Sequence, residues 1–343
     1  MPSPQHRPVG LGATLALAAA LTVTAACSGG TSASGAASSS TSSSGPYAIS
    51  LYTSVTQNTV DAVVGGFKRA HPGSTVSVYR TTTGNLNARI NADQRTGGVR
   101  ADVIWGTDPL SMATWAKEGL LKAHPVPLPS DIPAQYSTAE LIPTRLLYMV
   151  LVVHKGFTPV PTSWSDLTLP QYKGKVAISD PAAAGSAFAA LGYFAQAPGY
   201  GMAYFSKLKA NGAVQVSTIP EVVTDVADGR YQVGITLDSQ VRTAIAAGSP
   251  VQMVWPKPGA IALYSPIAVT AHSKQSAADT AFLDYVLSEQ GQKEIAATGW
   301  QPIVPGIPGP PIPAGGHEVW PDWPSLFPQE QQLLSRYQAI FGV

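Results

Sequence analysis

Apolar residues follow two alternating spacings along this chain from residue 47 onward. Short alternating or continuously apolar runs such as Tyr47–Tyr52 favour strands, and apolar residues three or four apart, such as Val60 and Val64, favour helices. We predict strands at 47–52, 76–79, 102–105, 146–153, 175–178, 213–217, 231–236 and 261–271. We predict helices at 58–70, 86–95, 109–119, 185–196, 200–210, 220–228, 239–247, 279–287, 290–298 and 329–341. Strands that alternate with helices are typical of a parallel sheet covered by helices, so the predicted fold class is α/β.

Two extended segments divide this α/β body into two lobes. The run Leu146–Val153 is the longest apolar stretch of the body and suits a buried strand, and 261–269 is a second apolar, extended segment. Each carries the chain from one lobe to the other, and each lobe is a mostly parallel sheet covered by helices. The first lobe is predicted to contain 46–149 and 263–303, and the second 150–262 and 304–343. The proline-rich stretch 301–324 is expected to lack regular structure.

The N-terminal segment carries a secretion signal. Two basic residues precede an apolar run, Leu11–Ala26, that is short for a membrane span and ends in small residues before Cys27. This arrangement resembles the lipobox of bacterial lipoproteins, in which Cys27 becomes the first mature residue and carries a lipid. We therefore predict a signal peptide at 1–26, a tether rich in Ser and Gly at 27–45, and an extracytoplasmic body anchored to the outer face of the membrane. The alternative is ordinary secretion, with cleavage elsewhere and a free thiol.

Composition narrows the classes of function. Charged residues make up 12% of the chain and the formal net charge is +1, which gives no electrostatic reason to expect nucleic acid as a partner. The single cysteine excludes an internal disulfide. The body has no GxSxG, HExxH, P-loop or GxGxxG motif, and its histidines lie far apart in the sequence. We therefore expect neither an enzyme nor a cofactor.

The stretch Ile178–Phe188 is the first candidate binding segment. It leaves an apolar strand, turns through small residues and enters an alanine-rich helix. Small side chains leave the N–H groups of the first helical turn open, and the helix dipole makes that position attractive to an anion. The alternative interpretation is an ordinary cap, with Asp180 as the N-cap and Pro181 as the first helical residue.

Similar junctions of small and polar residues follow other strands. Parallel strands gather such junctions at the carboxyl edge of a sheet, and two facing edges form a cleft for a small molecule. Each junction taken alone is also explained by helix capping. The predicted ligand-binding residues are Tyr52, Thr53, Ser54, Thr82, Thr83, Gly84, Asn85, Thr107, Asp108, Ala184, Gly185, Ser186, Asp238, Ser239 and Tyr264. We expect Gly185 to be small so that it admits the ligand.

Several segments resemble the bacterial extracellular solute-binding proteins of ABC importers. They are Gly174–Pro181 with Gly185–Ala187, Leu51–Ser54, Ala101–Trp105, Trp164–Leu167, Ala281–Tyr285 and Ser288–Gln292. The branch resembled is that of ferric-iron, 2-aminoethylphosphonate and hexose-phosphate receptors, and the resemblance covers about 47–341. It implies a two-lobed, type II periplasmic-binding-protein fold with two extended hinge crossings. It also implies a monomer without catalysis that passes a small molecule to the permease and ATPase subunits of an importer.

The chain departs from the iron-binding members of that branch. Those members carry two adjacent tyrosines where this chain has Asp238 and Ser239, and a histidine and a glutamate where it has Thr56 and Thr107. Ferric ion prefers anionic oxygen ligands, so we expect no metal to bind. The anion site of the branch aligns with the segment from Ala184 to Ser186, although Ala184 replaces the usual serine.

The resemblance and the junctions together predict a ligand with a phosphate or phosphonate group. An aminoalkylphosphonate is the favoured example, with its amine paired to Asp108 and Asp238. The alternatives within the receptor class are a sugar phosphate, another organic anion, and ferric iron or another metal. Outside that class they are a surface lipoprotein without a transport role and a secreted hydrolase.

Overall fold

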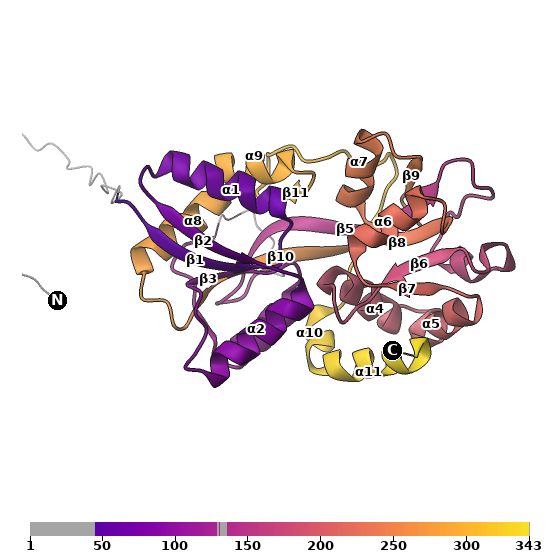
Figure 1. Cartoon of the computed structure of the whole chain (residues 1–343), viewed down its shortest axis with the longest axis horizontal. Coiled ribbons are helices and arrows are strands. Elements are labelled where there is room, and N and C mark those ends of the chain that lie inside the picture. Colours follow the sequence, from indigo (N-terminus) through magenta and orange to yellow (C-terminus); the bar gives the residue numbers. More distant parts are fainter. Residues whose placement is uncertain (1–44, 129, 131–135, 343) are drawn as a thin grey trace, which may run out of the picture. The chain divides into compact units, whose positions relative to one another are not determined.

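A mixed sheet of twelve strands runs through the computed structural model, which describes residues 45–128, 130 and 136–342 (Figure 1). Cys27, the predicted signal peptide and the tether to residue 44 lie outside the described residues. The strands are β1 (Ala48–Thr53), β2 (Thr75–Arg80), β3 (Val103–Trp105), β4 (Leu121–Lys122), β5 (Ile142–His154), β6 (Val176–Ser179), β7 (Val214–Val216), β8 (Val233–Leu237), β9 (Val251–Val254), β10 (Ala260–Thr270), β11 (Gln301–Pro302) and β12 (Glu318–Val319). The main order is β2-β1-β3-β10-β5-β8-β6-β7.

The sheet consists of two parallel sets joined by two long antiparallel strands. Strands β2, β1 and β3 are parallel to one another and form the first half of the sheet. Strands β8, β6 and β7 are likewise parallel and form the second half. Between them β10 is antiparallel to β3 and β5, and β5 is antiparallel to β8. The two predicted parallel sheets are therefore hydrogen-bonded into one, while the predicted assignment of residues to lobes stays a prediction.

Helices cover both faces of each half (Figure 1). In the first half Leu51 packs with α1 and α8, and its neighbour Tyr52 points to the opposite face with α2 and α3, as the period of two requires. In the second half Ile178 faces α4 and α5, and Ala177 faces α6 and α7. The helices are α1 (Gln57–Ala70), α2 (Thr83–Arg95), α3 (Pro109–Lys117), α4 (Gly185–Gln196), α5 (Gly201–Ala210), α6 (Ile219–Ala227), α7 (Asp238–Ala246), α8 (Ser276–Leu287), α9 (Glu289–Ala297), α10 (Trp323–Leu326) and α11 (Glu330–Phe341).

Some elements differ from the sequence prediction. Strand β9 was not predicted, and β11, β12 and α10 interrupt the stretch that was expected to lack regular structure. The strands β11 and β12 are two-residue pairings with β5 and β10, so tertiary contact rather than local pattern creates them. Helix α4 begins at Gly185, with Ala184 as its N-cap. The alternative in which Asp180 caps a helix is therefore wrong, because the Asp180 carboxylate instead accepts a bond from the Ala182 N–H in a turn.

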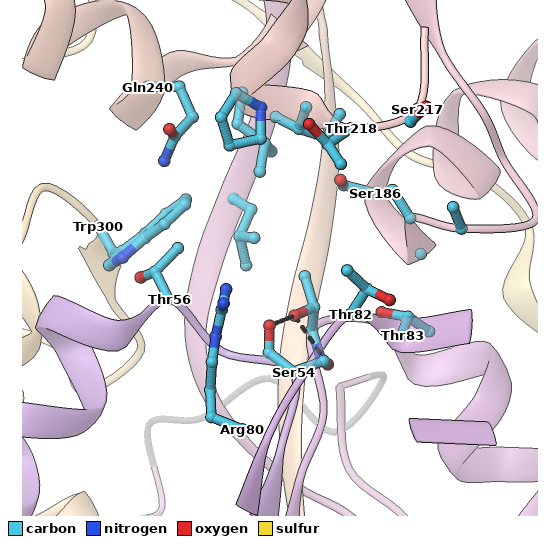
Figure 2. A pocket seen from close by; sticks show the side chains of 18 of the residues that line it. Ser54, Thr56, Arg80, Thr82, Thr83, Ser186, Ser217, Thr218, Gln240 and Trp300 are labelled. Atoms are coloured by element: carbon cyan, nitrogen blue, oxygen red, sulfur yellow. Dashed lines mark hydrogen bonds between the residues drawn. The ribbon is translucent and has the colours of Figure 1, made fainter. Parts of the chain in front are cut away.

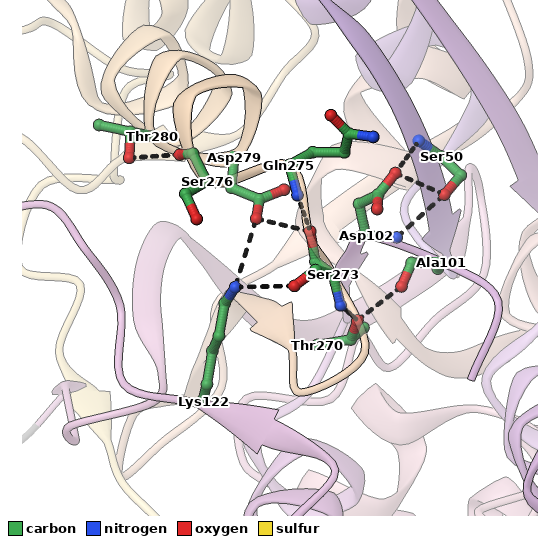
Figure 3. Close-up of polar contacts among 10 residues, drawn as sticks. All are labelled: Ser50, Ala101, Asp102, Lys122, Thr270, Ser273, Gln275, Ser276, Asp279 and Thr280. Atoms are coloured by element: carbon green, nitrogen blue, oxygen red, sulfur yellow. Dashed lines mark hydrogen bonds and ion pairs between the residues drawn. The ribbon is translucent and has the colours of Figure 1, made fainter. Parts of the chain in front are cut away.

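A polar network holds the amino ends of β1 and β3 together (Figure 3). The Asp102 carboxylate accepts bonds from the N–H and the hydroxyl of Ser50, at 2.8 and 2.7 Å. Nearby the buried Asp279 of α8 accepts a 2.7 Å bond from Ser273 and lies 3.6 Å from the Lys122 ammonium. These contacts tie the first half of the sheet to its covering helix and leave the carboxyl ends of the strands free for another role.

Candidate functional site: an anion-binding pocket

A pocket lies where the carboxyl ends of two parallel sets of three strands, which run in opposite directions, face each other (Figure 2). It encloses about 110 Å³, and segments that end or directly follow β1, β2, β3, β6, β7 and β8 line it. Seven of the fifteen predicted ligand-binding residues line this pocket: Ser54, Thr82, Thr83, Thr107, Ala184, Gly185 and Ser186. The geometry thus brings together predicted residues that are up to 132 positions apart in the sequence, counting from Ser54 to Ser186.

Five helices of the described chain direct their N-termini at the pocket. Its lining includes the N-caps of α1, α2, α4, α6 and α7, namely Thr56, Thr82, Ala184, Thr218 and Leu237. Thr82 and Thr218 cap their own helices with a side-chain oxygen, whereas the N-caps of α1, α4 and α7 supply no side-chain bond. N–H groups in the first turns of α1 and α4 are therefore available to a ligand, and the helix dipoles favour a negative one. In α7 the Asp238 carboxylate already accepts a bond from the Ser239 N–H.

Arg145 is the residue that distinguishes this pocket from a set of ordinary helix caps. It lies in β5, is only 1% exposed and lines the pocket. Its guanidinium carbon is 4.3 Å from the centre of the Trp300 ring, which also lines the pocket. Its Nε and Nη1 have no hydrogen-bond partner among the described residues. Burial lowers the pKa of Arg145 to about 9, so the side chain remains cationic at neutral pH and lacks a counter-charge.

Arg80 supplies a second positive charge. It ends β2, its Nε donates to the Val55 carbonyl at 3.1 Å, and its side chain extends into the space between Trp300 and Ser54 (Figure 2). Unlike Arg145 it is exposed to solvent. The two arginines therefore offer one buried and one accessible cation to the same cavity.

Twelve of the pocket residues were not in the predicted set: Thr56, Arg80, Arg145, Leu147, Ala183, Ser217, Thr218, Ile219, Pro220, Leu237, Gln240 and Trp300. A signal for two of them was present in the sequence. The pattern from Thr218 to Glu221 is a capping box, which marks a helix start directly after a strand. Arg145 immediately precedes the longest apolar run, and a charge at the start of a buried strand is unusual.

Asp108 points away from this pocket and lies against Gly185. Its Oδ1 accepts bonds from the N–H groups of Leu110 and Ser111 at 3.0 and 3.1 Å, which makes it the N-cap of α3. A Cβ atom at Gly185 would overlap the Asp108 carboxylate. Gly185 therefore has a packing reason to be small, because Asp108 lies against it. It also lines the pocket, so the expectation that it is small to admit a ligand stays a prediction. Burial raises the pKa of Asp108, and the two N–H groups oppose that rise.

Asp238 is also turned away from the pocket. It forms an ion pair with Arg242 one turn later in α7 and accepts a 3.4 Å bond from the Tyr148 N–H. Burial raises the pKa of Asp238, and Arg242 opposes that rise. Its neighbour Ser239 is buried and does not line the pocket. The predicted pairing of a ligand amine with Asp108 and Asp238 therefore loses its geometric basis.

The remaining predicted residues contribute to structure around the pocket rather than to its lining. Tyr52 lies on the opposite face of β1 and donates to Asp93 at 2.9 Å, and Thr53 donates to the Trp105 carbonyl at 2.8 Å. The Gly84 N–H donates to the Ala183 carbonyl at 3.3 Å and so joins the two halves beside the pocket. Asn85 is exposed on α2, and Tyr264 is buried in the core.

The described residues contain neither a cluster of metal ligands nor a helix suited to cross a membrane. Over residues 45–128, 130 and 136–342 no three His, Cys, Asp or Glu side chains are grouped so as to hold a metal ion. In the same ranges we find no helix with the length and apolar character needed to cross a membrane.

The sequence of the chain matches that of a family of receptors. The chain matches the family model of the bacterial extracellular solute-binding proteins over residues 49–301, and it therefore belongs to this family. Its role is that of the substrate-binding protein of an ABC importer, and it acts outside the cytoplasm. The family is one of solute-binding proteins rather than of enzymes.

Curated relatives cover the chain to different extents. An uncharacterized protein of Haemophilus influenzae is 24% identical over 259 residues, which are 71% of this chain and 73% of that protein. The spermidine/putrescine-binding periplasmic protein of Escherichia coli is 29% identical over 144 residues, which are 40% of this chain and 41% of that protein.

Solved structures share the fold over most of the chain. The periplasmic binding protein AfuA from Actinobacillus pleuropneumoniae, with fructose-6-phosphate bound, is similar with a TM-score of 0.77 and 21% identity, over 86% of this chain and 98% of that one. Iron-bound HitA from Pseudomonas aeruginosa is similar with a TM-score of 0.73 and 19% identity, over 86% of this chain and 99% of that one. The two-lobed, type II periplasmic-binding-protein fold predicted from the sequence is thereby confirmed.

Proposed function

We propose that this protein captures a small solute bearing a phosphate or phosphonate group and delivers it to the permease and ATPase subunits of its importer. The observation that carries the proposal is Arg145, a buried guanidinium in the pocket wall whose Nε and Nη1 have no hydrogen-bond partner among the described residues. A buried cation without a counter-charge is costly, and an anionic ligand is the group that relieves the cost. Phosphate and phosphonate oxygens suit the planar fork of an arginine.

The helix N-termini support the same class of ligand. The uncapped first turns of α1 and α4 add N–H donors, and their dipoles carry partial positive charge toward the cavity. Arg80 adds a further cation at the accessible side. Every charged group in the described lining is positive, which favours an anion over any cation.

The similar proteins are described with different ligands, and the lining of this pocket agrees best with the phosphate ligand described for AfuA. AfuA is described with fructose-6-phosphate, HitA with iron, and the Escherichia coli relative as a binder of spermidine and putrescine. The described lining contains no carboxylate, phenolate or imidazole, which are the groups that would hold a polyamine or ferric ion. An organic phosphate agrees with the lining, so metal and polyamine binding are not the functions we propose.

The cellular setting follows from the N-terminal sequence. We propose that Cys27 carries a lipid, that the Ser- and Gly-rich segment after it tethers the body to the outer face of the membrane, and that the receptor works as a monomer without catalysis. Replacement of Cys27→Ser should move the full-length protein from the detergent phase to the aqueous phase in a phase-partition assay. Equal partition of both forms would contradict the lipid anchor.

The ligand class is tested by calorimetry on the secreted body with inorganic phosphate, methylphosphonate and glucose 6-phosphate in a chloride-poor buffer. We expect at least one of them to bind, and Arg145→Met to weaken that binding by about a hundredfold or more, since a charge-assisted hydrogen bond contributes roughly 1.5–3 kcal/mol and two are removed. Arg95→Met is the matched control, because Arg95 is exposed on α2 outside the pocket. The proposal is wrong if none of the three binds, or if Arg145→Met binds as tightly as the parent.

A further inference from the structure

The pocket wall contains no acidic group that could receive an amine. Its lining combines two arginines with eight serine or threonine residues and one glutamine, and no described lining residue carries a carboxylate. A ligand that brings a phosphate to the arginines must place its remaining atoms against this neutral, hydroxyl-rich wall.

The acidic residues nearest to this wall are already committed to other partners. Asp108 caps α3 and packs against Gly185, and Asp238 pairs with Arg242. The Glu221 carboxylate accepts a 2.9 Å bond from the Ser217 N–H in the capping box of α6. None of the three lines the pocket, so each would have to break an existing interaction in order to reach a ligand cation.

Several neutral polar groups of the lining have no such commitment. The hydroxyls of Thr83, Ser186 and Ser217 and the amide of Gln240 line the pocket, and none makes a side-chain hydrogen bond to another described residue. Figure 2 shows Gln240 on the side of Trp300, and Ser186 with Ser217 on the opposite side. Groups that both donate and accept are matched by ligand hydroxyls, which also do both.

We propose that the pocket selects phosphate- or phosphonate-bearing solutes whose remaining part is uncharged and carries hydroxyl groups, and that it rejects the corresponding amines. The inference rests on the proposed function, because the anionic group must first be held by the arginines. An ammonium in the cavity meets two like charges and five helix N-termini, with no carboxylate among the described lining residues. At about 7 Å from one guanidinium and an effective dielectric constant of about 20, that repulsion lowers affinity on the order of tenfold to a hundredfold.

The test compares two pairs of probes that differ only in an amine and a hydroxyl. The pairs are 2-hydroxyethylphosphonate with 2-aminoethylphosphonate, and glucose 6-phosphate with glucosamine 6-phosphate, titrated at pH 7 by calorimetry. We expect the hydroxyl member to bind at least tenfold more tightly than its amine partner in any pair that binds. An amine member that binds equally or more tightly would overturn the inference and leave the proposed function standing. If no probe of either pair binds while inorganic phosphate or methylphosphonate does, the inference fails and the proposed function stands. If none of these ligands binds, the proposed function itself fails.

A charge introduced at Gln240 provides the second arm. Gln240→Glu places a carboxylate on the neutral wall and should lower the hydroxyl-to-amine affinity ratio by about tenfold or more. Gln94→Glu makes the same chemical change on the exposed side of α2 and should leave the ratio unchanged. An unaltered ratio in Gln240→Glu would show that the wall does not contact the ligand. Because the ratio in the parent protein is measured independently, a poorly folded variant does not remove the test.

Discussion

Arg145 and Ala184 both line the pocket, but one has a charged side chain and the other an apolar methyl group. Arg145 carries a full charge, and its Nε and Nη1 have no hydrogen-bond partner among the described residues. Ala184 is an N-cap whose methyl group can accept no hydrogen bond. Both residues leave hydrogen-bond donors without a protein acceptor: the Nε and Nη1 of Arg145 in one case, and N–H groups in the first turn of α4 in the other. At the residue scale, therefore, the same unpaired donors that can bind a ligand also lower the stability of the protein locally.

The variant Ala184→Asp should change stability and ligand affinity in opposite directions, and each can be measured separately. The aspartate would cap α4, which typically stabilises a protein by about 0.5–2 kcal/mol, and it would place a negative charge beside the anion. We expect a higher midpoint in urea unfolding together with a loss of affinity for the tightest-binding phosphate probe of about a hundredfold or more.

The control for this variant is Gln275→Asp. Gln275 is the exposed N-cap of α8 and makes no side-chain cap bond. It should show the stability gain without any change in binding. Unchanged affinity in Ala184→Asp would mean that the α4 N-terminus does not contact the anion.

Part of this pocket was predictable from the sequence, and the rest was not because it depends on contacts between distant segments. Ser54, Thr83, Thr107 and Ser186 lie in the junctions between a strand and the next helix, and each parallel set brings such positions to its carboxyl edge. Trp300 follows a helix near the other end of the chain, so its place beside Arg145 depends on the pairing of β11 with β5. Contacts set by strand register between distant segments leave no local pattern.

Among the elements, α8 depends on a charge that another element supplies. The buried Asp279 in its first turn has an Oδ1 without a partner, and Lys122 of β4 provides the nearby cation (Figure 3). Burial raises the pKa of Asp279, while Ser273 and Lys122 oppose the rise. The helix is therefore fixed to the sheet partly through an interaction that lies outside its own sequence.

Lys122→Met should lower the free energy of unfolding by about 1–3 kcal/mol at pH 7.5, because it leaves a buried carboxylate with less compensation. The loss should be smaller at pH 5. An acid whose folded pKa is raised can take up a proton as the pH falls, and the neutral form needs no cation. Lys274→Met changes an exposed lysine close in sequence and should have little effect. A loss that is the same at both pH values would exclude this electrostatic account.

Element types were easier to predict than element ends. The amphipathic period of α1 and the apolar run within β5 identify a helix and a buried strand without tertiary information. The start of α4 was misplaced in one interpretation, because Asp180 and Pro181 form an equally good cap pattern. The deciding factor is that Asp180 closes a turn onto Ala182, a choice that local propensity does not determine.

On the scale of the whole molecule, α3 and α11 meet although they come from opposite ends of the chain. Glu330 at the start of α11 lies with Asp108 in the lining of a second cavity, next to Gly185. Burial raises the pKa of Glu330 to about 7, Asp108 adds to the rise, and the Thr114 hydroxyl opposes it. Two carboxyl groups at this junction make its stability depend on pH.

Glu330→Gln should therefore stabilise the protein more at pH 8 than at pH 5. Below the ordinary pKa of a glutamate, both the folded and the unfolded forms hold the proton, and no penalty exists. As the pH rises through about 7 the folded form must ionise beside Asp108, and this cost is complete above that value. Urea unfolding at the two pH values measures the difference, with the exposed Glu118→Gln as control. A benefit that is equal at both values, or larger at pH 5, would contradict the assignment.

The sequence predicted that each half contains a parallel sheet, but it did not predict that the two sheets are hydrogen-bonded into one. Alternating strands and helices predicted two parallel sets, and both are present. The long pairing of β5 with β10, from Ile261–Met149 to Ile267–Ile142, turns them into one sheet. Both strands were recognised as extended apolar segments, but the pattern of an apolar run does not specify its partner or register.

The unpaired guanidinium of Arg145 also matters for handling the protein at the bench. A cation that lines a cavity and has no counter-charge among the described residues attracts whichever small anions the medium supplies. Sulfate, citrate or phosphate in a buffer will occupy the same donors as the solute and act as competitors. A dissociation constant measured in phosphate-buffered saline will then be larger than one measured in dilute Tris, and the choice of buffer becomes part of the binding constant.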